Sequence, residues 1–212
     1  DIGCFSFFPS KNLGCYGDGG LVTTNNEDLA KVLNIKRVHG GEPKYYHKVI
    51  GGNFRIDALQ AAVLRVKLPH LDKWSEKRRQ NANRYTQLFV EAGLAEETGK
   101  TSFDAKNKVL LPKAAFERFR VRNYHIYNQY IVRVDKRDQL REFLSKNEIG
   151  TEIYYPVPFH LQECFKELGH KKGDFPLSEF SADTSIALPI FPELSDEQLV
   201  FVVETIKKFF NQ

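Results

Sequence analysis

Short apolar runs alternate with segments of helical periodicity along this chain, and that alternation restricts the possible folds more than any other feature. Residues 2–8 are apolar and aromatic, long enough for one buried strand and too short for a stable helix. A glycine-rich turn follows at 13–20, and β-branched residues at 21–24 predict a second strand. Residues 26–38 combine an asparagine cap with leucine and valine at helical spacing. This order predicts an α/β fold at the start of the chain.

The remaining segments predict a long helix, a domain boundary and a second set of elements. A loop over 39–55 precedes an apolar stripe that begins at Leu59, and Pro69 should kink or break this helix before it ends at Gly93. Polar, patternless residues at 95–107 separate a first domain, 1–94, from a smaller α+β domain, 104–212. In the second domain we expect strands at 109–111, 128–134 and 151–155, and helices at 137–146, 161–168, 178–185 and 196–210.

Composition excludes several classes of protein. With 212 residues, of which 42% are hydrophobic and 27% charged, the chain can bury a core and does not have a disordered composition. No apolar run approaches the roughly 20 residues of a membrane helix. The excess of 31 Lys+Arg over 27 Asp+Glu is too small to indicate a nucleic-acid binder. Three cysteines without CxxC spacing favour a reducing cytoplasm. Because methionine is absent and the chain opens on strand-like residues, we expect a fragment or a processed product.

Lys11 is the first candidate for chemistry, because it follows the apolar run and precedes the glycine-rich turn. A lysine at the mouth of a buried strand is partly desolvated, so its amine is more often uncharged and can attack a carbonyl carbon. Ser6 lies just upstream and could hold a phosphate, and glycines let the backbone approach a ligand closely. On spacing alone, a surface lysine after a strand remains the simpler interpretation.

Asn53 and Arg55 form the second candidate, within the sequence GGNFR at 51–55. The amide could donate to a phosphate and the guanidinium could pair with an anion. A helix-entry loop with an incidental arginine explains the same pattern. The two common phosphate-loop signatures, GxxxxGK[ST] and a GxGxxG between strand and helix, do not occur in the sequence. The six histidines lack metal-ligand spacing, so no metal site is predicted.

A resemblance to a known family rests on the order of longer motifs. In chain order they are FSFFPSKNLGCYGDGG, RVHG, GGNFRIDALQAAVLRVKL, YNQYIVR, GTEIYYPVPFHLQ and ALPIFPELS. With these motifs the chain resembles the C-terminal portion of the DegT/DnrJ/EryC1/StrS family, which are pyridoxal 5'-phosphate (PLP) nucleotide-sugar aminotransferases. The resemblance implies an α/β fold, the C-terminal half of the aspartate aminotransferase (fold type I) architecture. The end of the large α/β domain with its connecting helix would lie at 1–94, and the small α+β domain at 104–212.

The resemblance also implies roles for individual residues. Lys11 stands where the family binds PLP covalently and moves a proton, and Ser6 where it contacts the cofactor phosphate. Asn53 stands where the phosphate of the neighbouring subunit is reached, which implies a homodimer with shared active sites. The residues that would line the nucleotide-sugar pocket are Arg37, Tyr46, His47, Arg55 and His160.

The implied reaction transfers an amino group, with glutamate as the expected donor, to a keto group of a nucleotide-linked sugar in polysaccharide biosynthesis. The wording FFPSKNLG favours 3-keto over 4-keto sugars, and neither a nucleic acid nor a membrane is an implied partner. The family's other cofactor contacts precede the lysine strand, so this chain alone is expected to bind PLP weakly and not to turn over. Its first strand should expose an unpaired edge. The alternative hypothesis is a non-catalytic dimerisation module of the same fold.

Overall fold

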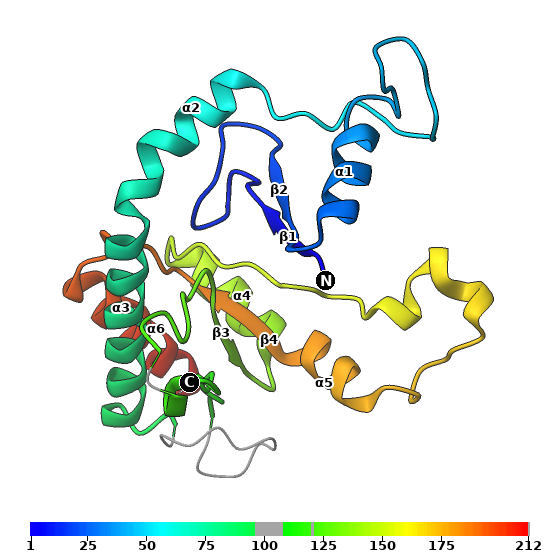
Figure 1. Ribbon diagram of the computed structural model, residues 1–212. Coiled ribbons are helices and arrows are strands. Elements are labelled where there is room, and N and C mark those ends of the chain that lie inside the picture. Colours follow the sequence, from blue (N-terminus) through cyan, green and yellow to red (C-terminus); the bar gives the residue numbers. More distant parts are fainter. Residues whose placement is uncertain (96–107, 120, 212) are drawn as a thin grey trace. The chain divides into compact units, whose positions relative to one another are not determined.

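The computed structural model describes residues 1–95, 108–119 and 121–211. They form two compact units, Asp1–Asp72 and Lys73–Gln212, whose elements are labelled in Figure 1. None of the helices in the described part of the chain is long and apolar enough to cross a membrane.

The division between the units falls near the start of the longest helix, α3 (Leu71–Glu91). The sequence places a boundary later, in 95–107, most of which lies outside the described residues. The physical reason for the earlier division is that α3 buries one face in the core of the second unit. The buried apolar side chains of that face are Ala82, Tyr85, Leu88 and Phe89.

The first unit is built on an antiparallel ribbon of two strands. β1 (Gly3–Ser6) pairs with β2 (Gly20–Thr23), in a register that places Phe5 opposite Leu21. The expectation of a buried strand is wrong for this chain, because Phe5 is 54% exposed and Leu21 is 48% exposed. A two-stranded ribbon has no third strand to cover its edge, and among the described residues β1 pairs with β2 only.

The helices of the first unit begin and end at residues with clear local causes. α1 (Glu27–Lys36) begins after Asn26, whose side chain accepts the N–H groups of the first turn. α2 (Ala58–Lys67) ends just before Pro69, and a 3-10 turn, η1 (Leu68–His70), links it to α3. Proline lacks an N–H and its ring clashes with the preceding turn, so the predicted break at this position is confirmed.

The second unit packs helices against another antiparallel pair of strands. β3 (Tyr130–Arg133) pairs with β4 (Ser185–Leu188). α3, α4 (Arg137–Lys146) and α6 (Asp196–Phe210) contribute to one hydrophobic core with both strands. The side chains that are completely or almost completely buried there include Tyr85, Tyr130, Leu140, Leu144, Ile186 and Ile206.

The helices of the second unit follow the sequence prediction more closely than the strands do. α4 and α6 have the predicted bounds, and α6 begins in a capping box between Ser195 and Gln198. The strand predicted at 151–155 is only a bridge between Glu152 and Ala187. The strand predicted at 109–111 is likewise reduced to a bridge of Leu110 with Arg133. β4 is not predicted, because all four of its residues are buried and show no polar alternation.

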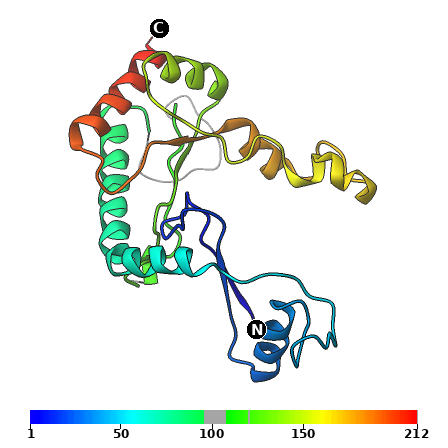
Figure 2. The ribbon, with the colours of Figure 1, turned by 90° about the horizontal axis from the view of Figure 1, so that it is seen from above.

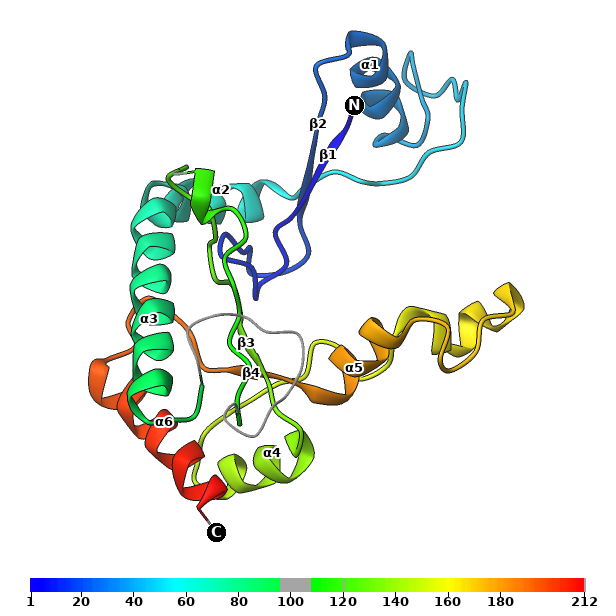
Figure 3. The same cartoon turned by 90° about the horizontal axis from the view of Figure 1, so that it is seen from below.

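Between β3 and β4 the chain leaves the core in a long excursion, residues 153–184, which we call the arm. It contains η3 (Phe159–Leu161), η4 (Glu163–Leu168) and α5 (Pro176–Thr184), where the sequence predicts helical stretches at 161–168 and 178–185. Figures 2 and 3 show the arm extending away from the strands of the second unit.

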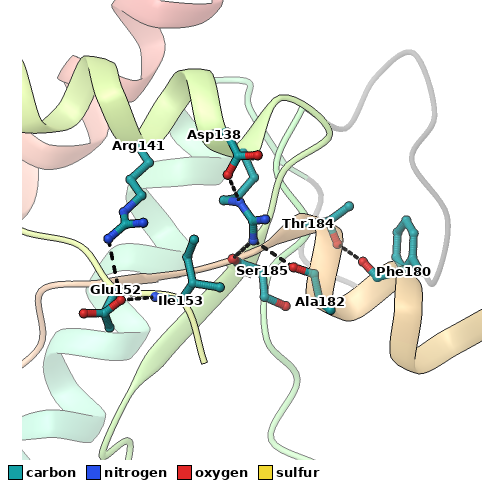
Figure 4. Close-up of polar contacts among 9 residues, drawn as sticks. Asp138, Arg141, Glu152, Ile153, Phe180, Ala182, Thr184 and Ser185 are labelled. Carbon is teal, nitrogen blue, oxygen red and sulfur yellow. Dashed lines mark hydrogen bonds and ion pairs between the residues drawn. The ribbon is translucent and has the colours of Figure 1, made fainter. Parts of the chain in front are cut away.

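Two arginines on α4 hold both ends of the arm. Arg141 lies 3.7 Å from Glu152, at the point where the arm begins (Figure 4). Arg137 donates to the carbonyls of Ala182 and Ser185, each at 2.9 Å, where the arm returns to β4. The Ala182 carbonyl lies in the last turn of α5, where carbonyls lack intrahelical donors, and Ser185 is the first residue of β4. The base of the arm is therefore fixed to the core by specific hydrogen bonds.

Candidate active site

Ser6 is the last residue of β1, and Lys11 lies in the turn that connects β1 to β2. Phe8 joins them, because its N–H donates to Ser6 Oγ at 3.3 Å and its carbonyl accepts the Lys11 N–H at 2.9 Å. The Cys15 N–H donates to the carbonyl of Phe7 at 2.8 Å and closes the loop further. The expected desolvation of Lys11 is not found, since its side chain is exposed beside an uncovered ribbon.

The glycine-rich part of this turn is held by close backbone packing and by α2. A Cβ atom at Gly14 would lie 2.5 Å from the carbonyl oxygen of Pro9. Lys67 of α2 donates to the Gly14 carbonyl at 2.7 Å, and Gln60 accepts the Tyr16 N–H at 2.8 Å. The sequence pattern does not single out Gln60 or Lys67. Their separation of seven residues, which places both on one helix face, is the signal that could have found them.

We expect Gly14→Ala to destabilise the turn, because its Cβ would collide with backbone atoms that cannot move independently. The free energy of unfolding should fall by about 1–3 kcal/mol, measured by chemical denaturation. Gly150→Ala is the control, since a Cβ at Gly150 meets nothing within 4 Å. Equal stability of the two variants would contradict the close packing at Gly14.

A second cluster forms where residues 37–55 fold back on the end of α1. Val38 bridges to Asn53, and the Phe54 N–H donates to the carbonyl of Arg37 at 3.1 Å. Arg55 Nε donates to Asn53 Oδ1 at 2.9 Å. The structure therefore brings Arg37, Asn53 and Arg55 together, all with exposed side chains. Because Asn53 Oδ1 accepts from Arg55, its Nδ2 group is the end that can donate to an anion.

His47 and Tyr46 lie in the outer part of the same loop. His47 Nδ1 lies 2.8 Å from the carbonyl oxygen of His39, so Nδ1 carries the proton and Nε2 is the acceptor of the neutral ring. Tyr46 is 69% exposed. Figures 1 and 3 show residues 38–54 at the α1 end of the first unit, and the Lys11 turn at the other end of the ribbon. Residues 38–54 and the Lys11 turn therefore lie at opposite ends of the first unit.

His160 belongs to η3 in the arm of the second unit. Its Nε2 lies 2.9 Å from Glu179 Oε1, and the two side chains are only 7% and 12% exposed. The Gly173 N–H also donates to both Glu179 oxygens, at 2.8 and 3.0 Å. These hydrogen bonds, the backbone one foremost, lower the pKa of Glu179 below its ordinary value. The sequence pattern does not identify Glu179, which lies 19 residues from its partner.

His160 also lines a groove of about 850 Å³ in the arm. Its walls come from residues 154–162 and 175–182 and are mostly aromatic or aliphatic, with Tyr155 71% and Leu177 74% exposed. Phe175 packs beside the imidazole, with the ring centroids 4.8 Å apart. Among residues 1–95, 108–119 and 121–211, no group of three or more histidine, cysteine or acidic side chains could hold a metal ion.

The fold of this chain matches that of the C-terminal half of PLP-dependent aminotransferases. DesV from S. venezuelae matches all of this chain with a TM-score of 0.84 and 34% identity, over 52% of its own length. An aminotransferase from Brucella abortus matches with a TM-score of 0.80 and 32% identity, over 100% of this chain and 51% of its own. The chain belongs to the DegT/DnrJ/EryC1/StrS aminotransferase family, whose model matches residues 1–207.

Curated relatives match over the same extent, nearly all of this chain and about half of their own length. The "Pleiotropic regulatory protein" of Geobacillus stearothermophilus is 47% identical, over 98% of this chain and 51% of the relative. The "UDP-N-acetyl-3-dehydro-alpha-D-glucosamine 3-aminotransferase" of Acidithiobacillus ferrooxidans is 36% identical, over 98% and 50%. The "dTDP-3-amino-3,4,6-trideoxy-alpha-D-glucose transaminase" of Streptomyces venezuelae is also 36% identical, over 98% and 50%. The chain thus spans about half the length of the curated relatives it matches.

Proposed function

We propose that this chain supplies the lysine-bearing half of a PLP-dependent nucleotide-sugar aminotransferase. Glutamate is the proposed amino donor and a 3-keto nucleotide sugar the proposed acceptor. The observation that carries the proposal is the family match over residues 1–207, which includes Lys11 and Ser6 in one closed turn. The names of the 3-aminotransferase and transaminase relatives support the keto position.

The residues of the Lys11 turn fit this cofactor. The exposed Lys11 amine is the group that condenses with an aldehyde. Ser6 Oγ accepts the Phe8 N–H, which leaves its own proton to donate to a phosphate oxygen. When bound, PLP supplies an electron sink for the negative charge that develops at Cα of the amino donor.

The chain's own residues would then do three things. Lys11 Nζ, as a free amine, would take the proton from Cα of the donor and pass it to C4′ of the cofactor; in the other half-reaction it would take a proton from C4′ and deliver it to the sugar carbon. Ser6 and Asn53 hold phosphate oxygens by hydrogen bonds. Arg37 and Arg55, which lie together in the folded 37–55 segment, pair with the anionic diphosphate of the nucleotide sugar.

The direct test of the proposed function is a half-reaction assay on the protein as its gene encodes it. L-glutamate should remove the visible absorbance of the bound cofactor, and a 3-keto nucleotide sugar should restore it, because the two half-reactions are separate. Residues 1–212 alone should bind PLP weakly and show neither change. An absorbance that does not respond to any amino donor would contradict the proposed reaction.

We also propose that the enzyme is a homodimer in which Asn53 serves the active site of the neighbouring subunit. The separation of residues 38–54 from the Lys11 turn within the first unit supports this arrangement. Loss of a hydrogen bond to a charged phosphate is worth about 1.5–3 kcal/mol, so Asn53→Ala should lower activity roughly 10- to 100-fold.

Mixed dimers test the sharing of sites. A heterodimer of one Lys11→Ala chain and one Asn53→Ala chain can be purified with a different tag on each chain. It has one intact site only if Asn53 acts across the interface. We expect about half of the wild-type activity per dimer, since one of two sites keeps both groups. Activity at or below that of the Asn53→Ala homodimer would show that Asn53 acts within its own chain.

A further inference from the structure

The pair of His160 and Glu179 is a feature of the arm that the proposed reaction does not yet use. The two side chains come from different elements, η3 and α5, and both are nearly buried. Their contact of 2.9 Å joins Nε2 to a carboxylate oxygen. Because an ionised carboxylate can only accept, Nε2 must carry a proton. Glu179 therefore determines which nitrogen of the ring is protonated.

The contact between Nε2 and Glu179 also determines which atom of the imidazole remains available to a ligand. His160 lines the groove of the arm while Nε2 is occupied by Glu179 and one side of the ring packs beside Phe175. Nδ1 is the remaining polar atom of the imidazole. In the neutral ring Nδ1 accepts a hydrogen bond, for example from a hydroxyl group of a ligand.

We infer that Glu179 is a positioning residue, which fixes the orientation and tautomer of His160 so that Nδ1 accepts a hydrogen bond from a hydroxyl group of the bound nucleotide. This inference rests on the proposed function for the identity of the ligand. A group held in place before binding loses less conformational entropy when the ligand arrives. An imidazole whose second nitrogen is hydrogen-bonded to a carboxylate is held in this way.

Glu179 has a second role in the arm, and the test must separate the two. It accepts the N–H of Gly173, so its loss would also loosen the turn before α5. Asp174 provides a matched control in the same turn. Its carboxylate accepts the Lys171 N–H at 3.1 Å and lies 3.5 Å from His170 Nδ1, so it holds the same turn through other residues than His160.

The experiment compares wild type, Glu179→Ala, Glu179→Gln and Asp174→Ala in the full-length holoenzyme. Nitrogen-15 spectra of labelled histidine identify the protonated nitrogen of His160, and calorimetry measures the dissociation constants of UDP and dTDP. We expect Glu179→Ala to change the His160 signals and to raise the dissociation constant of the bound nucleotide at least about tenfold. Glu179→Gln, which keeps the shape and one acceptor, should recover part of the affinity.

In Asp174→Ala we expect both readouts to stay as in wild type. Equal loss of affinity in Asp174→Ala would assign the effect to the turn and overturn the inference. The inference would also be overturned if Glu179→Ala left the His160 signals or the nucleotide affinity unchanged. A wild-type protein that binds neither nucleotide would overturn it as well. Since these readouts do not require turnover, an absent reaction with glutamate would refute the proposed function separately.

Discussion

Lys11→Ala is expected to abolish the attachment of PLP and to lower transamination at least about 10³-fold, since this residue is both the attachment point and the proposed acid–base group. Lys11 lies in a turn that is closed by hydrogen bonds to the carbonyls of Phe8 and Phe7. The rate that remains should come from free amines in solution. The effect should exceed that of any other substitution in the first unit.

The measurement is an intact mass spectrum of the full-length protein after incubation with PLP and reduction with borohydride. Wild type should gain one phosphopyridoxyl group, located on the Lys11 peptide, and Lys11→Ala should gain none. Lys31→Ala is the matched control, because Lys31 is an exposed lysine of α1 that pairs with Asp28. An adduct that persists in Lys11→Ala would transfer the role to another lysine.

Leu144→Ala is expected to produce the largest loss of stability. Leu144 is completely buried on α4, one turn after the equally buried Leu140. Removing its side chain forfeits the transfer free energy and leaves a cavity, and the two together should lower the free energy of unfolding by about 3 kcal/mol.

Chemical denaturation of both the variant and a matched control measures this loss. Leu168→Ala deletes the same atoms at a position that is 66% exposed in η4, so its stability should stay within about 0.5 kcal/mol of wild type. If the two leucine variants unfold at the same denaturant concentration, Leu144 does not belong to the cooperative core.

The sequence predicted elements well where local chemistry decides them. The bounds of α4 and α6 follow from apolar spacing and, for α6, from the Ser195 cap. The break before α3 follows from Pro69, whose missing N–H acts on its own turn. β4 was missed because four consecutive buried residues look alike in a helix and in a strand, and only pairing with β3 makes them a strand.

Some residues of the candidate site can likewise be predicted from the sequence, and others are identified only by the structure. The placement of Lys11 after a strand and the grouping of Asn53 with Arg55 are visible from neighbouring positions in the sequence. Gln60, Lys67 and Glu179 could not be found so directly, since each acts on a residue far away in the chain. The expected desolvation of Lys11 was wrong because burial depends on what covers the ribbon, and β1 has only β2 beside it among the described residues.

The sequence by itself determined the family, the order of the elements and the lysine on which the proposed chemistry depends. These properties reside in motifs and periodicities of a few residues, where backbone sterics and local hydrogen bonds act. Only the tertiary structure decided where the chain divides into units, which residues hold the Lys11 turn, and which nitrogen of His160 carries the proton. Each of these results from contacts between distant segments, whose free energy exists only once the chain has folded.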